Sequence, residues 1–391
     1  MIIHVSGERE LVVEAVISGV GGTSFGPLPG SDGLSLQREA MQLALADADL
    51  EIGEIDGLIA AYSLARPHMM LASWFAEYAG VRPEVCFAVQ SGGASAAIMV
   101  MQAAALVNAG ICRHVLLVTG DNRLTGMSRD GAVAALSEVG HPDFERPYGI
   151  SIPASYALVA QRYMHEYGVT LDDLGAIAVA MRTNAARHPG AHMRETLTME
   201  DVAASRVISS PLRMVDCCLI SDGGAAVIVS ARSAAPRARV TVAGAGQGHT
   251  HEHIVAAPSL TEFGCSASSR AAFARAGVTA QDIDVVQIYD SFTITLLVEL
   301  ESIGFFGRGE AGREIAAGAL DITGRLPCNT HGGLLSHGHS GAAGGMFHIV
   351  EAVTQLQGRA DRRQVRDPKL AFVHGDGGIL SAHCSLVLAR T

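Results

Sequence analysis

The chain has 391 residues, of which 49% are hydrophobic and 17% are charged, so it can bury a large core and lacks the composition of a disordered protein. Its formal net charge is −11, and no stretch combines clustered basic residues with aromatic ones, which excludes a nucleic-acid-binding surface and disfavours anionic membranes. The seven cysteines form no CxxC pair, which favours reduced thiols over a disulfide framework or a zinc ribbon. Without a leader or membrane-spanning pattern, we expect a cytoplasmic protein.

The first part of the chain alternates apolar runs, several of them ending in glycine, with longer stretches of helical pattern. Because the apolar runs are mostly continuous, they predict strands of a sheet that is covered on both faces. The predicted strands cover residues 12–26, 57–62, 114–121 and 225–231. The predicted helices cover residues 34–50, 94–110 and 155–168. This alternation predicts a layered α/β fold.

The second part of the chain repeats the first part in the same order. Asp56 and Asp284 occupy equivalent points of the two parts. Three further segments have counterparts: residues 239–250 resemble 12–26, residues 339–358 resemble 91–110, and residues 369–378 resemble 113–121. Repetition in one order predicts a duplicated domain, with two similar α/β units packed together.

The repeat also predicts where the parts of the chain divide. We expect an N-terminal half made of residues 1–121 and 216–235, and a C-terminal half made of residues 236–391. Residues 122–215 are predicted to form a loop region inserted in the first half. A long insertion at a strand end commonly forms a lid or a substrate wall.

Three motifs in the second half resemble those of thiolases. They are YDSFT at residues 289–293, CNTHGGLLSHGHSGAAGG at 328–345, and VHGDGGILSAH at 373–383. The ordered combination resembles the sterol-carrier-protein type of this superfamily, and the likeness extends over essentially the whole chain. The resemblance implies the thiolase fold, which is two βαβαβαββ units in an αβαβα arrangement. It also implies a homodimer and a coenzyme A thioester as substrate, with no covalently bound cofactor.

The expected thiolase nucleophile is missing. In thiolases a cysteine opens the helix after the third strand, where the helix N-terminus lowers its pKa. Aligned on that pattern, this chain has Gly93, while Cys86 comes too early and Ser91 is two residues away. The second thiolase cysteine is also absent from the HGDGG turn. Schiff-base catalysis is excluded as well, since Lys369, the single lysine, lies in a polar turn.

Two groups suited to proton transfer remain at motif positions, namely Tyr289 and His339. A tyrosine at position 289 resembles the thiolase-like aldolases of steroid side-chain degradation, which lack the nucleophilic cysteine, although those carry a second tyrosine in place of His339. A retro-aldol reaction needs a base and an oxyanion hole but no nucleophile. We expect Tyr289 or His339 to be the base, and the glycine backbone near Gly93 or Gly377 to stabilise the enolate.

Supporting roles are expected for three further residues. The thiolase resemblance implies that Asn329 orients a catalytic water or a loop, whereas Asp290 either supports the site or caps the following helix. His141, in the insertion, either faces the acyl group or lies in a surface loop.

No metal site is expected, because the histidines at 331, 337 and 339 lack a carboxylate at ligand spacing. Arg182 and Arg213 are candidates for coenzyme A contacts. The resemblance further implies a small partner protein with a zinc ribbon and an OB fold.

The leading hypothesis is therefore an acyl-CoA enzyme that breaks or makes a carbon–carbon bond, by retro-aldol cleavage of a β-hydroxyacyl-CoA. One alternative is a retro-Claisen thiolase or acyltransferase with a displaced nucleophile, such as Cys86 or Ser91. Another is a non-catalytic subunit that binds acyl-CoA or lipid, in which Tyr289 only anchors a strand end. The leading hypothesis requires Tyr289 and His339 to lie on the same side of the protein.

Overall fold

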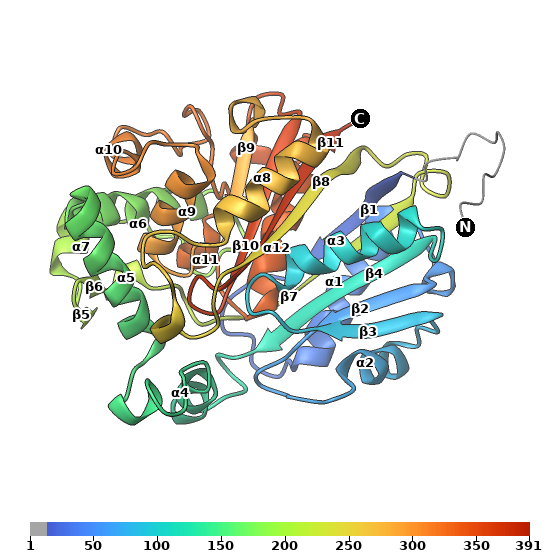
Figure 1. Ribbon diagram of the computed structural model, residues 1–391. Helices are drawn as coiled ribbons and strands as arrows, with labels where there is room; N and C mark the ends of the chain where they lie inside the picture. Colours follow the sequence, from blue (N-terminus) through green and yellow to red (C-terminus); the bar gives the residue numbers. More distant parts are fainter. Residues whose placement is uncertain (1–13) are drawn as a thin grey trace, which may run out of the picture.

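The computed structural model describes residues 14–391 (Figure 1). The first two residues of the strand predicted at 12–26 lie outside the described residues, as do residues 1–11, to which the expectation of no leader refers. The strands are β1 (Ala15–Gly22), β2 (Gly57–Ala61), β3 (Val85–Val89), β4 (His114–Asn122), β5 (Val207–Ser209), β6 (Leu212–Arg213), β7 (Asp222–Ala231), β8 (Val240–His249), β9 (Val285–Ile288), β10 (Leu370–Gly377) and β11 (Ala382–Arg390). The helices are α1 (Gly33–Ala48), α2 (Leu71–Ala79), α3 (Ser95–Asn108), α4 (Arg129–Ser137), α5 (Ile152–Tyr167), α6 (Leu171–Ala185), α7 (Met199–Ala204), α8 (Cys265–Ala276), α9 (Thr293–Ile303), α10 (Ala311–Ala316), α11 (Gly333–Ser336) and α12 (Ala342–Leu356).

Nine strands form one mixed sheet in the order β3-β2-β4-β7-β1-β8-β11-β10-β9. The first five strands of this order belong to the first half of the chain and the last four to the second half. The halves meet at β1 and β8, which share only the pairs Val16–Thr241 and Ile17–Val240. The small β5–β6 ribbon is separate.

The helices form three layers around the two halves of this sheet, as Figure 1 shows. Helices α3 and α12 lie in the middle, where they contact each other and strands from both halves. Every residue of α12 except Thr354 is buried, which is typical of a helix enclosed on all sides. Helices α1 and α2 cover the outer face of the first half, and α8 and α9 cover that of the second half. This is the expected αβαβα arrangement.

The two halves of the chain share one loop contact, made by an aspartate just before β2 in the first half and just before β9 in the second half. The carboxylate of Asp56 accepts hydrogen bonds from the backbone N–H groups of residues 113 and 114 at 2.7 and 2.9 Å. The carboxylate of Asp284 does the same for the N–H groups of residues 369 and 370, also at 2.7 and 2.9 Å. Each aspartate thus ties the loop before one strand to the start of its neighbour. In the second half, the third strand is reduced to one bridge between Val286 and Cys328.

The insertion between β4 and β7 carries α4 to α7 and the β5–β6 ribbon. It packs mainly on the second half, because α5 and α6 contact α9, and α6 contacts α10 and α11. The segment that starts at one strand end of the first half therefore reaches across the molecule. In residues 14–391, no helix is both long enough and apolar enough to cross a bilayer.

Candidate functional site

A pocket of about 250 Å³ lies where the two central helices begin. Gly92 and Gly93, which precede α3, line it, and so do His339 and Gly341, which precede α12. The positive ends of two helix dipoles therefore point toward one cavity, which favours the development of negative charge there. The other polar side chains of the pocket are Tyr62, Arg123, Tyr156, Cys217, Cys218, Tyr289, Ser291 and Asp376.

The structure brings Tyr289 and His339 together in this pocket. Tyr289 follows the last residue of β9, and its hydroxyl lies 2.8 Å from Nε2 of His339. The two residues come from different motifs that the fold places side by side. On the other side of the imidazole, Nδ1 of His339 lies 3.2 Å from Sγ of Cys218. Tyr289, His339 and Cys218 thus form a continuous hydrogen-bonded series.

The three groups of this series are uncharged at neutral pH. Burial raises the pKa of Tyr289 well above its ordinary value, and the neighbouring Tyr62 and Cys218 add to the effect. Burial lowers the pKa of His339 well below its ordinary value, and the charge of Arg123 lowers it further. Burial also raises the pKa of Cys218 to about 12. A neutral phenol, imidazole and thiol in contact can relay a proton, but the thiol is a poor nucleophile.

Gly93 is packed directly against Tyr289. A Cβ atom at position 93 would overlap the tyrosine ring and the carbonyl oxygen of Asp376. A side chain at the thiolase nucleophile position is therefore incompatible with Tyr289 in its present place. The absence of the cysteine and the presence of the tyrosine are two aspects of one packing arrangement.

Two charged or ionisable residues of the pocket were not predicted. Arg123 is 5% exposed, and its Nε atom has no hydrogen-bond partner among the described residues. Asp376 accepts a hydrogen bond from the hydroxyl of Tyr156 at 3.1 Å, and burial together with the charge of Glu299 raises the pKa of Asp376 well above its ordinary value. Both residues stand at the carboxyl ends of strands, β4 and β10, where ligands of α/β proteins commonly bind. Their position at the ends of predicted strands could therefore have marked them as candidate binding residues in the sequence.

The predicted roles of Asp290 and Asn329 are not supported by their contacts. Asp290 does not cap α9, whose N-cap residue has no side-chain hydrogen bond; its Oδ1 atom accepts the N–H of Leu334 in α11 at 2.7 Å. The amide of Asn329 makes two hydrogen bonds of 2.8 Å to the backbone of Ile288. Asn329 therefore holds the end of β9, next to Tyr289, and it does not line the pocket.

Two other predicted residues do not line the pocket. His141 packs on Phe144 and His253, its Nδ1 atom accepts the N–H of Asp143, and it does not line the pocket. Gly377 packs against Ser91 and Gly92, whereas the next residue, Gly378, lines the pocket. In this turn the pocket is therefore lined by Gly378, one residue after the predicted Gly377.

The alternative nucleophiles lie elsewhere as well. Cys86 is on β3 and packs with α2, on the face of the sheet away from α3. Neither Cys86 nor Ser91 lines the pocket, and Lys369 is exposed outside it. Cys218 is the thiol that the pocket brings next to the histidine. The loop between the insertion and β7 supplies this thiol, and the thiolase motif does not.

The arginines proposed for coenzyme A contacts are engaged in local structure. Arg182 donates from Nε to the hydroxyl of Ser336 at 3.2 Å, and Arg213 belongs to the turn closed by Asp216. Neither lines the pocket.

Two of the histidines considered for a metal site, those at 331 and 337, are buried, and their rings pack edge to face.

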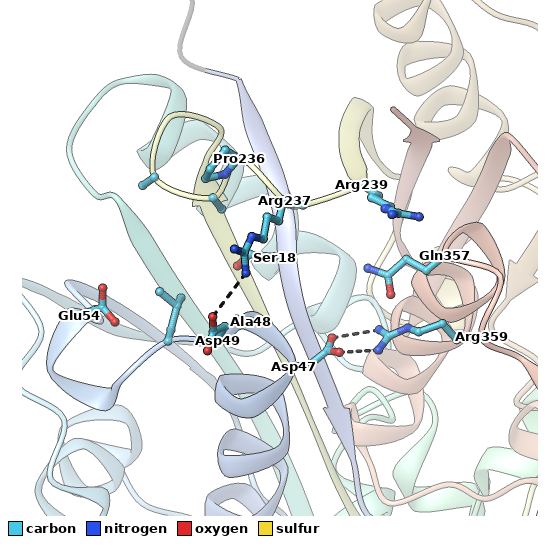
Figure 2. Close-up of a pocket in the computed structure, with 14 residues that line it drawn as sticks. Ser18, Asp47, Ala48, Asp49, Glu54, Pro236, Arg237, Arg239, Gln357 and Arg359 are labelled. Carbon is cyan, nitrogen blue, oxygen red and sulfur yellow. Dashed lines mark hydrogen bonds and ion pairs between the residues drawn. The ribbon is translucent and has the colours of Figure 1, made fainter.

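A second depression, shown in Figure 2, lies at the other end of the molecule. It is formed by the C-terminal ends of α1 and α12 and by the loop between β7 and β8. Asp47 and Arg359 form a two-bond ion pair across it, at 2.5 and 3.0 Å. Since α12 begins at the Tyr289–His339 pocket and ends here, this depression is separate from the candidate site.

Comparisons with known proteins agree with this geometry. Residues 246–390 match the family model "Thiolase C-terminal domain-like". A 17-hydroxy-3-oxo-4-pregnene-20-carboxyl-CoA lyase of Mycobacterium tuberculosis is 35% identical over 88% of this chain and 92% of its own length. A steroid side-chain-cleaving aldolase of Thermomonospora curvata is 36% identical over 88% of this chain and 90% of its own length. A solved structure described as an Ltp2–ChsH2(DUF35) aldolase superposes with a TM-score of 0.85 and 33% identity, over 96% of this chain and 98% of that chain.

Proposed function

Because the chain belongs to the thiolase superfamily, in the group that contains the steroid side-chain-cleaving aldolases, we propose that it cleaves a β-hydroxyacyl-CoA by retro-aldol chemistry. The observation that carries this proposal is the neutral Tyr289–His339 pair, in which the Tyr289 ring occupies the space that a side chain at Gly93 would need. The pocket thus offers a proton acceptor and positive helix ends, which are the two things that the reaction requires.

In the proposed reaction, Tyr289 and His339 move one proton. The substrate β-hydroxyl gives its proton to the Tyr289 oxygen while Tyr289 passes its own proton to Nε2 of His339. The hydroxyl oxygen then forms a carbonyl as the Cα–Cβ bond breaks, and the bond electrons form a thioester enolate. The same proton returns through Tyr289 to Cα, which gives a ketone or an aldehyde and a shortened acyl-CoA. The reaction requires the tautomer of His339 with the proton on Nδ1, and the sulfur of Cys218, 3.2 Å from Nδ1, can accept that proton in a hydrogen bond.

The enolate would be stabilised by positively charged and positively polarised groups at the pocket. The N-terminal ends of α3 and α12 supply a positive potential, and Arg123 supplies a buried guanidinium. An oxyanion donor of this kind typically contributes roughly 10²–10³ in rate. We assign enolate stabilisation to these groups in place of Gly377.

The walls of the pocket favour a bulky apolar acyl group. The apolar lining comes from the insertion and from the loop before β7, together with Leu64 and Phe292. The residues supplied by the insertion and that loop are Leu136, Val139, Ile152, Pro153, Leu219 and Ile220. The named relatives act on steroid substrates, so a steroid-like acyl-CoA is the substrate class that we propose.

We also propose two assemblies. The DUF35 component named with the solved relative supports a small partner protein of that kind for this chain. Strand β3 is an edge of the large sheet, so its free side can pair with β3 of a second copy to form a homodimer. Light scattering after gel filtration tests the dimer, because it would give about twice the 40.7 kDa of one chain.

The decisive experiment compares two substrates with the same steroid acyl group. The protein, alone and with a DUF35 partner, is incubated with the β-hydroxyacyl-CoA, or with the β-ketoacyl-CoA plus free coenzyme A, and the products are followed by mass spectrometry. We expect carbonyl release from the β-hydroxyacyl-CoA without consumption of free coenzyme A. The rate should fall by roughly 10²–10⁴ in Tyr289→Phe and persist in Cys86→Ala, the matched thiol control.

The thiol next to the histidine provides the opposing outcome. Cleavage of the β-ketoacyl-CoA that consumes free coenzyme A and disappears in Cys218→Ala would mean that the enzyme is an acyltransferase with Cys218 as nucleophile. Retention of full activity in Tyr289→Phe would also contradict the retro-aldol mechanism. Lack of turnover with every acyl-CoA, despite tight binding, would favour the non-catalytic subunit.

A further inference from the structure

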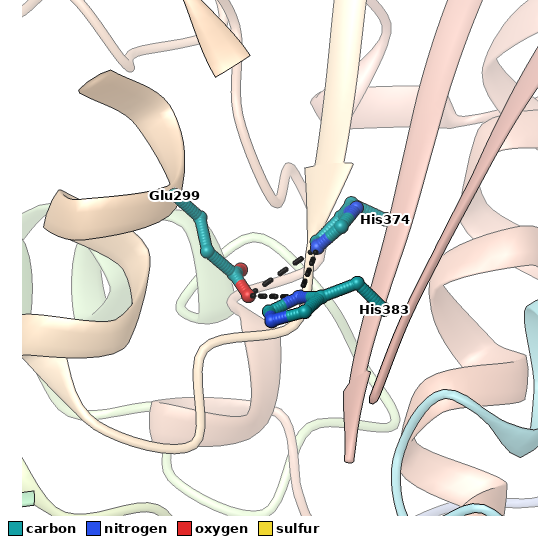
Figure 3. Close-up of side chains that lie close together, drawn as sticks. All are labelled: Glu299, His374 and His383. Carbon is teal, nitrogen blue, oxygen red and sulfur yellow. Dashed lines mark hydrogen bonds and ion pairs between the residues drawn. The ribbon is translucent and has the colours of Figure 1, made fainter. Parts of the chain in front are cut away.

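A second cluster of reactive side chains lies behind the pocket, in the core of the second half (Figure 3). Glu299 extends from α9, His374 from β10 and His383 from β11. All three side chains are buried with 0% exposure. In the described part of the chain, this is the only group of three or more histidine, cysteine or acidic side chains whose ligand atoms all lie within 4.8 Å of one another.

The spacing of the three ligand atoms matches a tetrahedral metal ion. Nε2 of His374 is 3.1 Å from Nδ1 of His383 and 3.4 Å from Oε1 of Glu299. The remaining edge, from Nδ1 of His383 to Oε1 of Glu299, is 3.7 Å. Zinc bonds of roughly 2.0–2.2 Å place two tetrahedral ligands roughly 3.3–3.6 Å apart. One ion at the centre can therefore bind all three atoms with little movement of the side chains.

Hydrogen bonds on the far side of each imidazole direct the lone pairs into the cluster. Nε2 of His383 lies 3.0 Å from the carbonyl oxygen of Leu380, which can only accept, so this nitrogen carries the proton. Nδ1 of His374 lies 2.8 Å from the hydroxyl of Ser385, which can accept the proton of this nitrogen and donate its own to Ser268 at 2.9 Å. Such outer hydrogen bonds are typical of metal-binding histidines, because they fix the tautomer and the ring orientation.

Glu299 faces the two imidazoles without a hydrogen bond. Neither oxygen of Glu299 has a hydrogen-bond partner among the described residues. A buried carboxyl group without a partner is costly. A cation at the centre of the cluster would remove this cost.

We propose that Glu299, His374 and His383 bind a divalent transition-metal ion of the zinc type, with one coordination position left for water. The donor set of two imidazoles and one carboxylate is typical of zinc. The ion would join α9 to the β10–β11 hairpin, and β10 carries Asp376 of the pocket two residues after His374. These two histidines differ from those at 331, 337 and 339, for which the sequence predicts no metal site. The proposal is independent of the retro-aldol function.

The test measures metal in the whole purified protein, with no added ligand. Elemental analysis by mass spectrometry should find about one zinc per chain. X-ray absorption at the zinc edge should show nitrogen and oxygen neighbours at roughly 2.0–2.1 Å and no sulfur. Glu299→Gln, which keeps the side-chain volume, should reduce the bound zinc by roughly tenfold or more and lower the melting temperature.

His114→Gln is the matched control, because His114 is also a buried histidine that contacts a serine of the next strand, at 2.8 Å. The His114→Gln variant should bind as much zinc as the unmodified protein. The proposal is overturned if the protein grown or refolded with zinc holds no transition metal, or if the absorption spectrum shows sulfur ligands. It is also overturned if a folded Glu299→Gln retains as much zinc as the control. If this variant does not fold, the metal content and the absorption spectrum of the unmodified protein still decide.

Discussion

Replacement of Gly93 by alanine tests whether Tyr289 truly occupies the space of the missing nucleophile. The new methyl group would overlap the Tyr289 ring and the carbonyl oxygen of Asp376, and neither can yield without moving the pocket. Overpacking of this kind costs roughly 1–3 kcal/mol. Displacement of the ring also breaks the 2.8 Å contact with His339, so we expect kcat to fall by roughly 10² or more.

Gly53→Ala is the matched control, since an added Cβ at Gly53 has nothing within 4 Å. Both variants are compared by urea denaturation and by steady-state kinetics of carbonyl release. In a Tyr289→Ala background, Gly93→Ala should cost less unfolding free energy than in the unmodified protein, with a coupling of roughly 0.5–3 kcal/mol. The destabilisation that comes from the overlap with the Asp376 carbonyl oxygen should remain in both backgrounds. Stability and activity of Gly93→Ala equal to those of the control would refute the packing argument.

Three further predictions concern charged residues. Arg123→Met should lower kcat by roughly 10²–10³ with the fold intact, and a change confined to KM would exclude a role in enolate stabilisation. Arg363→Met should destabilise the protein by roughly 3–5 kcal/mol, because it leaves the buried Glu351 unpaired. Although burial opposes it, the charge of Arg363 keeps the pKa of Glu351 below its ordinary value. In the variant, burial without the guanidinium should instead raise the pKa of Glu351 above its ordinary value. The stability difference measured by urea denaturation should therefore be full only above that raised pKa and should vanish as the pH falls through the lowered pKa of the unmodified protein; a difference independent of pH would contradict this. Lys369→Arg should leave kcat unchanged, and borohydride should trap no adduct, as the exposed lysine is outside the pocket.

The packing of the pocket explains why an aldolase can arise on a thiolase fold. Gly93 and Tyr289 exclude a side chain at the nucleophile position, while the helix N-termini that serve thioester chemistry remain in place. The surrounding walls are supplied by the insertion, which can vary independently of this point.

Much of the architecture could be predicted from the sequence alone. Buried runs of apolar residues identified the central strands and helices, and the repeated aspartates, Asp56 and Asp284, marked the duplication through identical loop contacts. The ordered motifs identified the superfamily, and the glycine at position 93 identified the missing nucleophile. These features depend on local patterns, which a linear sequence records directly.

The roles of individual side chains were decided by tertiary contacts. Asn329 binds the backbone of Ile288, and Asp290 accepts a hydrogen bond from the first turn of α11. Their motifs therefore predicted where these residues lie, but not which groups they contact. Arg123 and Cys218 reach the pocket from either side of the insertion, and no spacing in the sequence links them to His339.

The sequence by itself determined the fold, the duplication and the absence of a thiolase nucleophile, because each depends on periodicity or on a residue at a motif position. Only the tertiary structure decided which groups meet: Tyr289 with His339, and Glu299 with His374 and His383. The physical reason is that hydrogen bonding and coordination depend on distances of about 3 Å between atoms from distant segments. Those distances are set by how the helices pack on the sheet, not by separation along the chain.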